Sequence, residues 1–356
     1  MRGVVLRRIL SALVAMCFVV ACGIAASSTR DVQRSLTPVE HHRGEEQTWL
    51  TFPEWYLVHS PAEFARYMAA QRPPSEFPFL GHVGQLWSSY GQVIKATRDR
   101  TFNAGYHVMI VVIATSTTIE YGLREAYEVL IGRLGELTRR HGPTAEEKLA
   151  AKVAQDYVDF VRVSPWYDFD FWTPLRAVWR DTGCGGDDVV RKWERKYALS
   201  TEYLAKGLYG WVIRKATHAS YEAPLLTTAV VVDRWVDRIS GSWPEMKRVS
   251  SFRDGGELVL LPRYEAFKGV ATALARSGAN FVEIAGNPRD ALILVSVLVS
   301  DQWQPDARGV HTLFEQPVLT EPGRKRAVLE VRVGELAQVL REFDGMQVTV
   351  EHAYDY

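Results

Sequence analysis

The sequence predicts an α+β protein with an N-terminal membrane anchor, a helical bundle domain and tandem ferredoxin-like α+β modules. Three observations predict this fold class. A long uncharged run opens the chain, one helical framework occurs twice in its middle, and strand and helix patterns alternate after Pro224. The expected boundaries are a leader at 1–30, a tether at 31–47, a helical domain at 48–223, and two α+β modules at 224–287 and 288–356.

Composition excludes a disordered chain and a general affinity for nucleic acid. The 356 residues are 47% hydrophobic and include 11 Trp, which is enough for one large core or for several domains. The 42 basic residues balance 42 acidic residues, so no overall field attracts a polyanion. A nucleic-acid partner is therefore not expected.

The leader has the pattern of a targeting segment. Arg2, Arg7 and Arg8 precede an uncharged run from Ile9 to Thr29, which is close to the ~20 residues that cross the hydrocarbon of a bilayer. Within this run, Val19-Val20-Ala21-Cys22 resembles a bacterial lipobox, so Cys22 is a lipidation candidate, and an uncleaved anchor helix is the alternative. Both readings place the protein in the bacterial cell envelope, membrane-anchored through its N-terminus with the globular part outside the cytosol.

The segment 31–47 is polar and contains His41-His42-Arg43-Gly44-Glu45-Glu46. Paired His and Glu side chains could bind a divalent metal, but metal sites are usually held on rigid elements with supporting partners. A solvated tether is therefore the favoured interpretation. Beyond the leader only Cys184 remains, so no intramolecular disulfide is expected, and we interpret this residue as an inert thiol in a Gly-rich turn.

An aromatic-rich block at 48–61 includes Glu54 and His59. Ser60-Pro61 followed by Glu63 predicts a helix start, because Ser is a good cap, Pro suits the first helical position, and an acid suits the first turn.

The segment 103–119 contains His107 and is otherwise free of acids and strong bases. This composition could indicate a helix that crosses a membrane, but the fully apolar centre of the segment extends only from Val108 to Ala114. A buried helix of a bundle is the favoured reading, because charged groups near hydrocarbon are costly.

The most informative pattern is the helical framework at 118–133, which returns at 200–215. The copies match at Glu120 and Glu202, Tyr121 and Tyr203, Arg124 and Lys206, Tyr127 and Tyr209, Ile131 and Ile213, and Arg133 and Lys215. In each copy an acid stands four residues before a base, the order that favours an ion pair along one helix face. We expect the two helices to lie side by side. If their ion pairs face each other, four alternating charges would lie inside an aromatic-lined interface.

Apolar periodicity predicts which faces of the two copies are buried. One apolar face of the first copy consists of Ile119, Leu123, Ala126, Tyr127, Leu130 and Leu134, and the inner face of the second consists of Leu204, Leu208, Trp211 and Val212. The first helix is expected to continue to about Arg140. Thr144 with Glu147 predicts a capping box for the next helix.

Residues 164–179 interleave aromatic side chains with Asp168 and Asp170. Such a segment could form a cup for a sugar or a cationic ligand. The favoured interpretation is a loop over the helical core, with its rings packed inward and its acids in water.

Beyond Pro224 the pattern predicts a β-α-β-β-α-β module that then repeats. The expected strands are 227–233, 248–253, 257–261, 280–285, 291–299, 326–332 and 347–353, with helices at 264–277 and 334–343 and a short helix within 235–245. Phe267 aligns with Leu336 and Val270 with Val339, which indicates a duplicated module.

Four segments carry a resemblance to a known family. They are Phe52-Pro53-Glu54-Trp55-Tyr56-Leu57-Val58-His59-Ser60, the helix from Tyr106-His107 to Arg133, the run Arg191-Lys192-Trp193-Glu194-Arg195-Lys196, and the ending Val350-Glu351-His352-Ala353-Tyr354-Asp355-Tyr356. Together they resemble an uncharacterised family of bacterial membrane-associated proteins with no established activity. The resemblance supports the architecture and supplies no catalytic residues.

The sequence lacks phosphate-loop, dinucleotide-binding, zinc-protease and serine-hydrolase motifs, so it predicts no cofactor and no metal. The candidate ligand-binding residues are Glu54, His59, His107, Glu120, Arg124, Glu202 and Lys206. Two hypotheses follow. The favoured one is a non-catalytic, membrane-tethered envelope protein that binds a partner or ligand, with the twinned ion pairs as a structural network. The alternative is an enzyme or small-molecule-binding protein that uses the carboxylate, His and aromatic residues of the helical domain.

Overall fold

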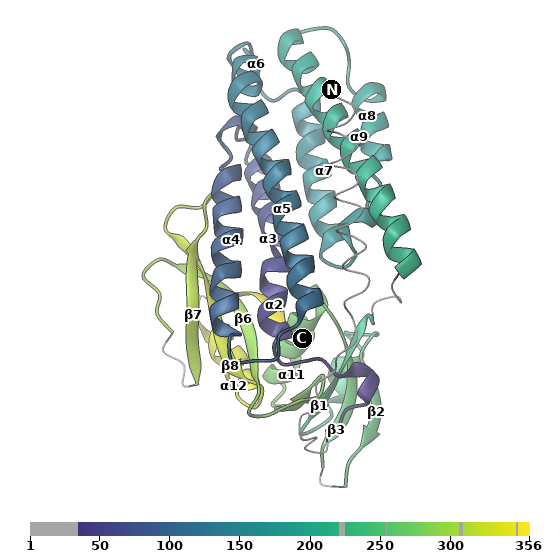
Figure 1. Cartoon of the computed structure of the whole chain (residues 1–356), viewed down its shortest axis with the longest axis vertical. Coiled ribbons are helices and arrows are strands. Elements are labelled where there is room, and N and C mark those ends of the chain that lie inside the picture. Colours follow the sequence, from purple (N-terminus) through teal and green to yellow (C-terminus); the bar gives the residue numbers. More distant parts are fainter. Residues whose placement is uncertain (1–34, 221–224, 254, 306–308, 347) are drawn as a thin grey trace. The chain divides into compact units, whose positions relative to one another are not determined.

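The structure, a computed structural model, describes residues 35–220, 225–253, 255–305, 309–346 and 348–356. A helical region comes first, and two antiparallel sheets with interspersed helices follow, which confirms the α+β class (Figure 1). The described residues form two compact units. The helical unit contains 55–86 and 103–220, and the α+β unit contains 35–54, 87–102 and the described residues from 225 onward.

The helices of the first region follow one another closely. In chain order they are η1 Val39–His41, α2 Gln47–Glu54, α3 Tyr56–Ala69, η2 Pro74–Glu76, α4 Phe79–Ala96, α5 Ala104–Tyr127, the π-helix η3 Glu128–Gly132, α6 Arg133–Leu137, α7 Ala145–Val161, η4 Trp166–Asp168, α8 Trp172–Arg180 and α9 Val189–Ser220. The capping box of α7 is confirmed, since Thr144 and Glu147 exchange side chain and backbone hydrogen bonds. Among the helices that the structure describes, α5 included, none combines the length and apolarity of a membrane-crossing helix.

The predicted start of a helix at Ser60 is wrong. The Trp55 carbonyl already accepts the N–H groups of Val58 and His59, so α3 begins at Tyr56 and Pro61 lies inside it. The aromatic block before Ser60 is therefore helical.

The segment interpreted as a solvated tether is docked on the α+β unit in its described part. The Glu283 carboxylate of β4 accepts the Leu36 and Thr37 N–H groups at 2.9 and 3.0 Å, and the Ser35 and Thr37 hydroxyls at 2.5 and 2.6 Å. Farther along, Arg43 donates its N–H to the Ala285 carbonyl. Residues 35–43 therefore belong to the folded part, and the expectation of a solvated tether is wrong for them.

The α+β unit contains two sheets of corresponding strand order. Its elements are β1 Thr227–Val232, α10 Asp237–Ser240, β2 Lys247–Ser251, β3 Glu257–Pro262, α11 Glu265–Arg276, β4 Phe281–Ile284, β5 Asn287–Pro288, β6 Leu292–Ser300, β7 Val310–Pro317, β8 Arg324–Arg332, α12 Leu336–Gly345 and β9 Thr349–Tyr354. The first sheet has the order β2-β3-β1-β4-β5 and the second β7-β8-β6-β9, with every pairing antiparallel.

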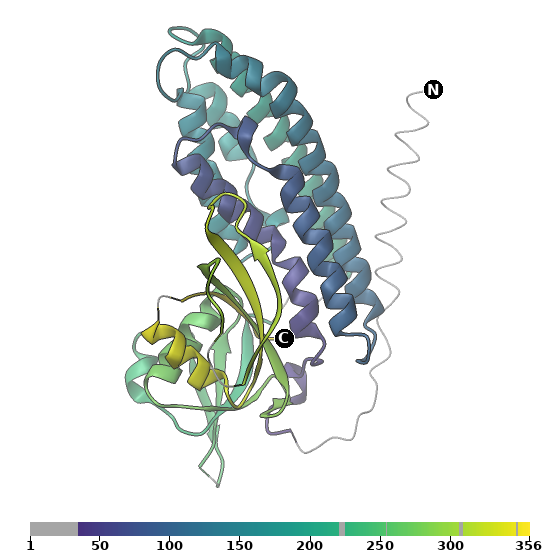
Figure 2. The same ribbon diagram turned by 90° about the vertical axis from the view of Figure 1, so that its left-hand side faces the viewer.

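The helices α11 and α12 pack together within one continuous core, and Figure 2 shows them side by side. The aligned residues Phe267, Val270, Leu336 and Val339 are all fully buried in this core. The strand β7 was not expected from the sequence. It is an edge strand with mixed polar and apolar side chains, so it lacks the apolar run of the central strands.

Candidate functional site

Four charged side chains of α5 and α9 form a closed ring, which we call the four-charge ring. Within the helices, Arg124 lies 3.8 Å from Glu120, and Lys206 lies 3.0 Å from Glu202. Between the helices, Arg124 lies 3.2 Å from Glu202, and Lys206 lies 2.9 Å from Glu120. Each charge therefore has two partners of opposite sign, and the two ion pairs face each other across the helices.

The two helices run antiparallel, as the pairing of early residues of α5 with late residues of α9 requires. Ser116 contacts Tyr209 through their hydroxyls at 3.4 Å, and Tyr127 donates its hydroxyl to the Glu194 carboxylate at 2.9 Å. The ring lies between these two contacts. One interhelix bridge joins Glu120 to Lys206, and the other joins the matching residues Glu202 and Arg124. The two copies of the repeat are therefore related to each other by a local pseudo-twofold axis.

The ring is partly shielded from water, and its charges stabilise each other. The Glu202, Arg124 and Lys206 side chains are 23%, 20% and 19% exposed, whereas Glu120 is 40% exposed. Burial alone would raise the pKa of Glu202, but the charges of Arg124 and Lys206 outweigh it and lower the pKa to about 2. Burial would likewise lower the pKa of Lys206, and the charges of Glu120 and Glu202 raise it instead.

Aromatic rings from four other segments surround the two cations. The guanidinium of Arg124 lies 4.7 Å from the ring centre of Phe64 and 4.9 Å from that of Phe79. The ammonium of Lys206 lies 5.5 Å from Tyr157 and 5.8 Å from Phe171. These are cation–π distances, so the aromatic lining expected from the sequence is present and adds to the stability of the cations.

The other described candidate residues belong to α2, α3 and the first turn of α5. Glu54 ends α2 in the α+β unit, and Cys22 lies outside the described residues. His59 is buried in α3 with its ring beside those of Trp55 and Tyr56. His107 lies in the first turn of α5, roughly 20 Å along the helix from Glu120 at 1.5 Å per residue.

His107 is half-buried, and burial lowers its pKa. Neutral imidazole is therefore its favoured form near neutral pH. Among the described residues, no group of three or more His, Cys, Asp or Glu side chains is arranged to hold a metal ion.

A second set of buried charges lies farther along the same helices, and sequence reasoning missed it. We call it the buried network: Glu128, Glu147, Arg191, Glu194 and Arg195. Arg195 donates to both carboxylate oxygens of Glu128 at 2.9 and 3.1 Å, and Arg191 donates to Glu147 and Glu194 at 2.9 Å each. The guanidinium of Arg191 is fully buried, which is rare for a charge without such pairing. The signal was available in the helical spacing of Arg191, Glu194 and Arg195 on one face of α9.

The π-helical turn η3 shapes the helix around this network. Arg191 donates to the Gly132 carbonyl at 2.9 Å, and a Cβ atom on Gly132 would lie 2.2 Å from the Glu128 carboxylate. Only a glycine leaves room for the carboxylate at that point. π-helical turns often mark functional or structurally demanding positions, and here the turn accommodates an ion pair.

Beside the network, Lys196 and Glu146 form a fully buried pair at 3.3 Å. The ammonium of Lys196 also donates to the carbonyls of Val178 and Thr182 at 2.7 and 2.9 Å. It donates in addition to the Thr182 hydroxyl, so the ammonium has three hydrogen-bond acceptors inside the helical unit besides its ion pair with Glu146.

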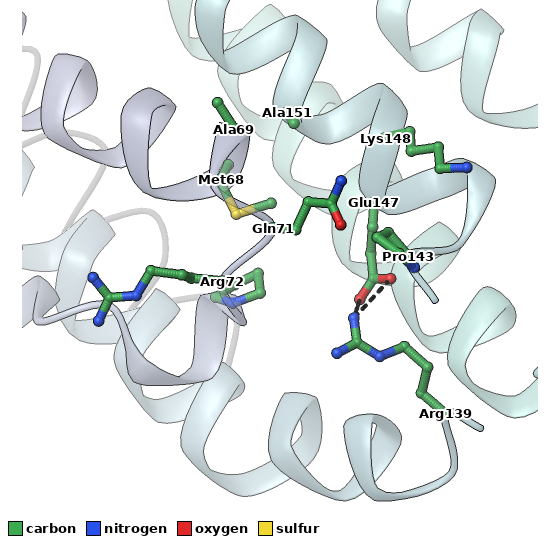
Figure 3. A pocket seen from close by; sticks show the side chains of 10 residues that line it. Met68, Ala69, Gln71, Arg72, Arg139, Pro143, Glu147, Lys148 and Ala151 are labelled. Atoms are coloured by element: carbon green, nitrogen blue, oxygen red, sulfur yellow. Dashed lines mark hydrogen bonds and ion pairs between the residues drawn. The ribbon is translucent and has the colours of Figure 1, made fainter. Parts of the chain in front are cut away.

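A small pocket of about 170 Å³ opens beside the network (Figure 3). Arg139, Glu147 and Lys148 line it together with Gln71 and Arg72. Arg139 lies 3.3 Å from the Glu147 carboxylate, so these two charged lining groups are paired with each other. The pocket is small beside the ~300–1,000 Å³ of typical ligand sites.

The apolar faces of α5 and α9 point the opposite way from the prediction. The side chains of Ile119, Leu123, Leu130, Leu134, Leu204, Leu208, Trp211 and Val212 are between 45% and 69% exposed. The opposite faces of both helices carry the four-charge ring and the buried network. The buried network therefore lies in the interior of the helical unit, whereas the four-charge ring is only partly shielded from water, and the prediction of an apolar inner face was wrong.

The aromatic segment 164–179 packs only part of its rings inward, and it is not a loop throughout, because α8 begins at Trp172 and the side chains of Trp172 and Trp179 are 39% and 49% exposed. Phe169 and Phe171 cluster with Tyr157 at ring distances of 5.3 and 5.7 Å. Asp168 pairs with Arg214 at 2.8 Å, and Asp170 accepts the Trp172 N–H at 3.0 Å at the start of α8. Both acids have structural partners.

Comparison of the whole chain with protein-family models, curated proteins and solved structures found no match.

Proposed function

We propose that this chain is a non-catalytic protein of the bacterial cell envelope, tethered to a membrane by its N-terminus. In this proposal the helical unit is a scaffold held by internal charges, and the α+β unit consists of tandem ferredoxin-like modules that engage an envelope partner. The proposal includes membership of the uncharacterised membrane-associated family that the sequence resembles.

The four-charge ring is closed, and this observation is the main support for a non-catalytic function. Each charge has two opposite partners within 3.8 Å, so the ring is electrically balanced by its own members. A site for an anionic or zwitterionic ligand would need to break these pairs before binding. Interhelix ion pairs that alternate in sign serve instead to fix which helices pair and in which register.

The strand orders support the tandem modules. In the first sheet β4, β1, β3 and β2 are neighbours in that order, as in a ferredoxin-like fold, and β9, β6, β8 and β7 repeat it. The membrane tether rests on the leader pattern of the sequence, and the docked residues 35–43 would join the leader to the α+β unit.

Reversing the signs of the four charges tests whether the ring has a structural role or binds a ligand. The single variant Glu202→Lys places three cations around Glu120, and we expect it to destabilise the helical unit. The fourfold variant Glu120→Lys, Arg124→Glu, Glu202→Lys, Lys206→Glu restores alternation with all signs reversed. It should regain most of the lost stability, less about 0.5–1 kcal/mol for each cation–π contact removed.

The readout combines denaturation with in-membrane cross-linking to neighbouring proteins. A fourfold variant that folds and keeps the wild-type cross-linking partners supports the scaffold. A variant that folds but loses those partners would place partner binding at the ring and refute its purely structural role. A variant that folds but loses a co-purifying small molecule would favour the enzyme or small-molecule alternative.

The tether is tested by intact mass of the protein purified from membranes. A mature chain beginning with lipidated Cys22, or a full-length chain extracted only by detergent, is expected. Recovery from the cytosol with the leader intact would refute this part of the proposal.

A further inference from the structure

The outward faces of the two repeated helices form two apolar stripes. The α9 stripe consists of Val190, Trp193, Tyr197, Leu204, Leu208, Trp211 and Val212, and the α5 stripe consists of Ile119, Leu123, Leu130, Leu134 and Leu137, with its last two residues in α6. From Trp193 to Val212 no exposed position of α9 carries a charge. Within the stretch from Ile119 to Ile131, the Glu120 side chain of the four-charge ring is 40% exposed. Each stripe recurs at helical spacing, so it is a continuous face of its helix.

The two stripes lie on neighbouring antiparallel helices, and we refer to them together as the joined stripes. The rings of Tyr127 and Tyr197 lie 6.1 Å apart at one point between the helices, and the Ser116 and Tyr209 hydroxyls meet at 3.4 Å at another. The α9 stripe is roughly 28 Å long at 1.5 Å per residue from Trp193 to Val212. Soluble monomers rarely expose a contiguous apolar surface of this extent, and where they do it marks an interaction site.

We propose that the joined stripes rest on the surface of a lipid bilayer, with α5 and α9 lying in its interfacial plane. The proposal rests on the proposed function, since it takes the membrane tether as given. It goes beyond that proposal because it assigns the helical unit a membrane contact of its own, separate from the leader.

The leader favours a lipid bilayer over a protein as the partner that covers the stripes. Residues 1–34 contain the uncharged run from Ile9 to Thr29, which is long enough to anchor the chain. An anchored chain stays next to the bilayer, so the effective concentration of lipid near the stripes is high. Even a weak contact between the stripes and the bilayer is then formed much of the time.

The chemistry of the stripes also fits a bilayer surface. Trp193, Tyr197 and Trp211 are amphipathic aromatics of the kind enriched at membrane interfaces. Basic residues border the stripes: Arg133 and Arg140 are exposed near one end, and at the other the Lys215 ammonium lies 4.7 Å from the Trp211 ring. Apolar faces bordered by Lys and Arg are typical of helices that lie on anionic membranes.

Lipid photo-cross-linking of the full chain tests this contact. The protein is reconstituted in vesicles of phosphatidylcholine and phosphatidylglycerol that contain a phospholipid with a diazirine in its acyl chain, and cross-linked peptides are located by mass spectrometry. We expect lipid adducts on peptides covering 117–137 and 189–215, in addition to the leader peptide. The exposed face of α7, which carries Lys152 and Asp156, should remain unlabelled.

Two variants sharpen the result. Leu204→Glu with Leu208→Glu should reduce labelling of the stripes roughly tenfold, because two charges near hydrocarbon oppose the contact. Both positions are exposed, so folding should persist, which hydrogen exchange of α9 peptides verifies. The control Lys152→Glu should leave the labelling unchanged.

The outcomes separate this inference from the proposed tether. Adducts on the leader alone would overturn the bilayer contact and leave the tether intact, and adducts on the stripes alone would do the reverse. A parallel sample treated with a protein-reactive cross-linker tests for a protein partner. Cross-links from the stripes to a second copy or to another protein, without lipid adducts on the stripes, would also overturn the contact.

Discussion

Replacement of Glu202 with Gln should destabilise the helical unit far more than loss of an ordinary surface ion pair. The variant keeps the size of the side chain and removes its charge, which leaves Arg124 and Lys206 with Glu120 as their shared acid. The pKa of Glu202 falls from 4.5 to about 2 in the folded chain. A shift of that size corresponds to roughly 3 kcal/mol at neutral pH, and because the side chain retains some contact with water we expect about 1–3 kcal/mol.

The pH dependence follows from the direction of that shift. The folded pKa of Glu202 is lower than its unfolded value, so its stabilising effect is complete above about pH 5 and is lost as pH falls towards 2. The free energy of unfolding of the wild type and of Glu202→Gln should therefore converge on acidification.

The assay is urea unfolding of the full chain in detergent, followed by far-UV circular dichroism from pH 7 to pH 3. Hydrogen exchange of α9 peptides assigns the transition to the helical unit. The matched control is Asp156→Asn, which breaks an exposed pair with Lys152 at the same four-residue spacing. That control should cost no more than about 0.5 kcal/mol. Equal losses for the two variants at pH 7, or a loss that does not shrink at low pH, would refute the reasoning.

Three further predictions follow from single contacts. Lys196→Met should cost roughly 3–5 kcal/mol because it leaves the Glu146 carboxylate buried without its cation, and adding Glu146→Leu should restore much of that loss in thermal unfolding. Gly132→Ala should destabilise the helical unit by about 1–3 kcal/mol, because the added Cβ displaces the Glu128 carboxylate. The control Gly122→Ala has open space around the added Cβ and should stabilise the helical unit by up to about 1 kcal/mol. Equal urea midpoints for the two variants would contradict this prediction. Glu283→Gln should raise the hydrogen-exchange rate of the Leu36 and Thr37 amides by roughly tenfold or more, and unchanged protection would show that the carboxylate does not hold this segment.

The sequence predicted the pairing of the repeated helices and the α+β character of the chain after Pro224 because both depend on local patterns. An acid four residues before a base is visible in each copy, and helix–strand alternation is visible in each module. The strand β7 was missed because an edge strand needs no continuous apolar run, and its register against β8 is set by pairing rather than by its own side chains.

Helical periodicity identified the two faces of α5 and α9 but not which one is buried. Both the charged face and the apolar face repeat with the same period, and the usual expectation that the apolar face is buried was wrong here. The choice depends on non-local partners: Arg191 is buried because Glu147 of α7 reaches it. No pattern within α9 alone contains that information.

The charge order of the repeat also explains why the two helices pair antiparallel. In a parallel, in-register pair, Glu120 would face Glu202 and Arg124 would face Lys206, so like charges would meet at both positions. Antiparallel pairing brings Glu120 to Lys206 and Arg124 to Glu202, at 2.9 and 3.2 Å. A duplicated helix with one acid-to-base step thus disfavours parallel packing with its copy and selects the antiparallel arrangement. The same duplication copies the apolar face, so antiparallel pairing places both stripes on one side of the helix pair and creates a single apolar surface.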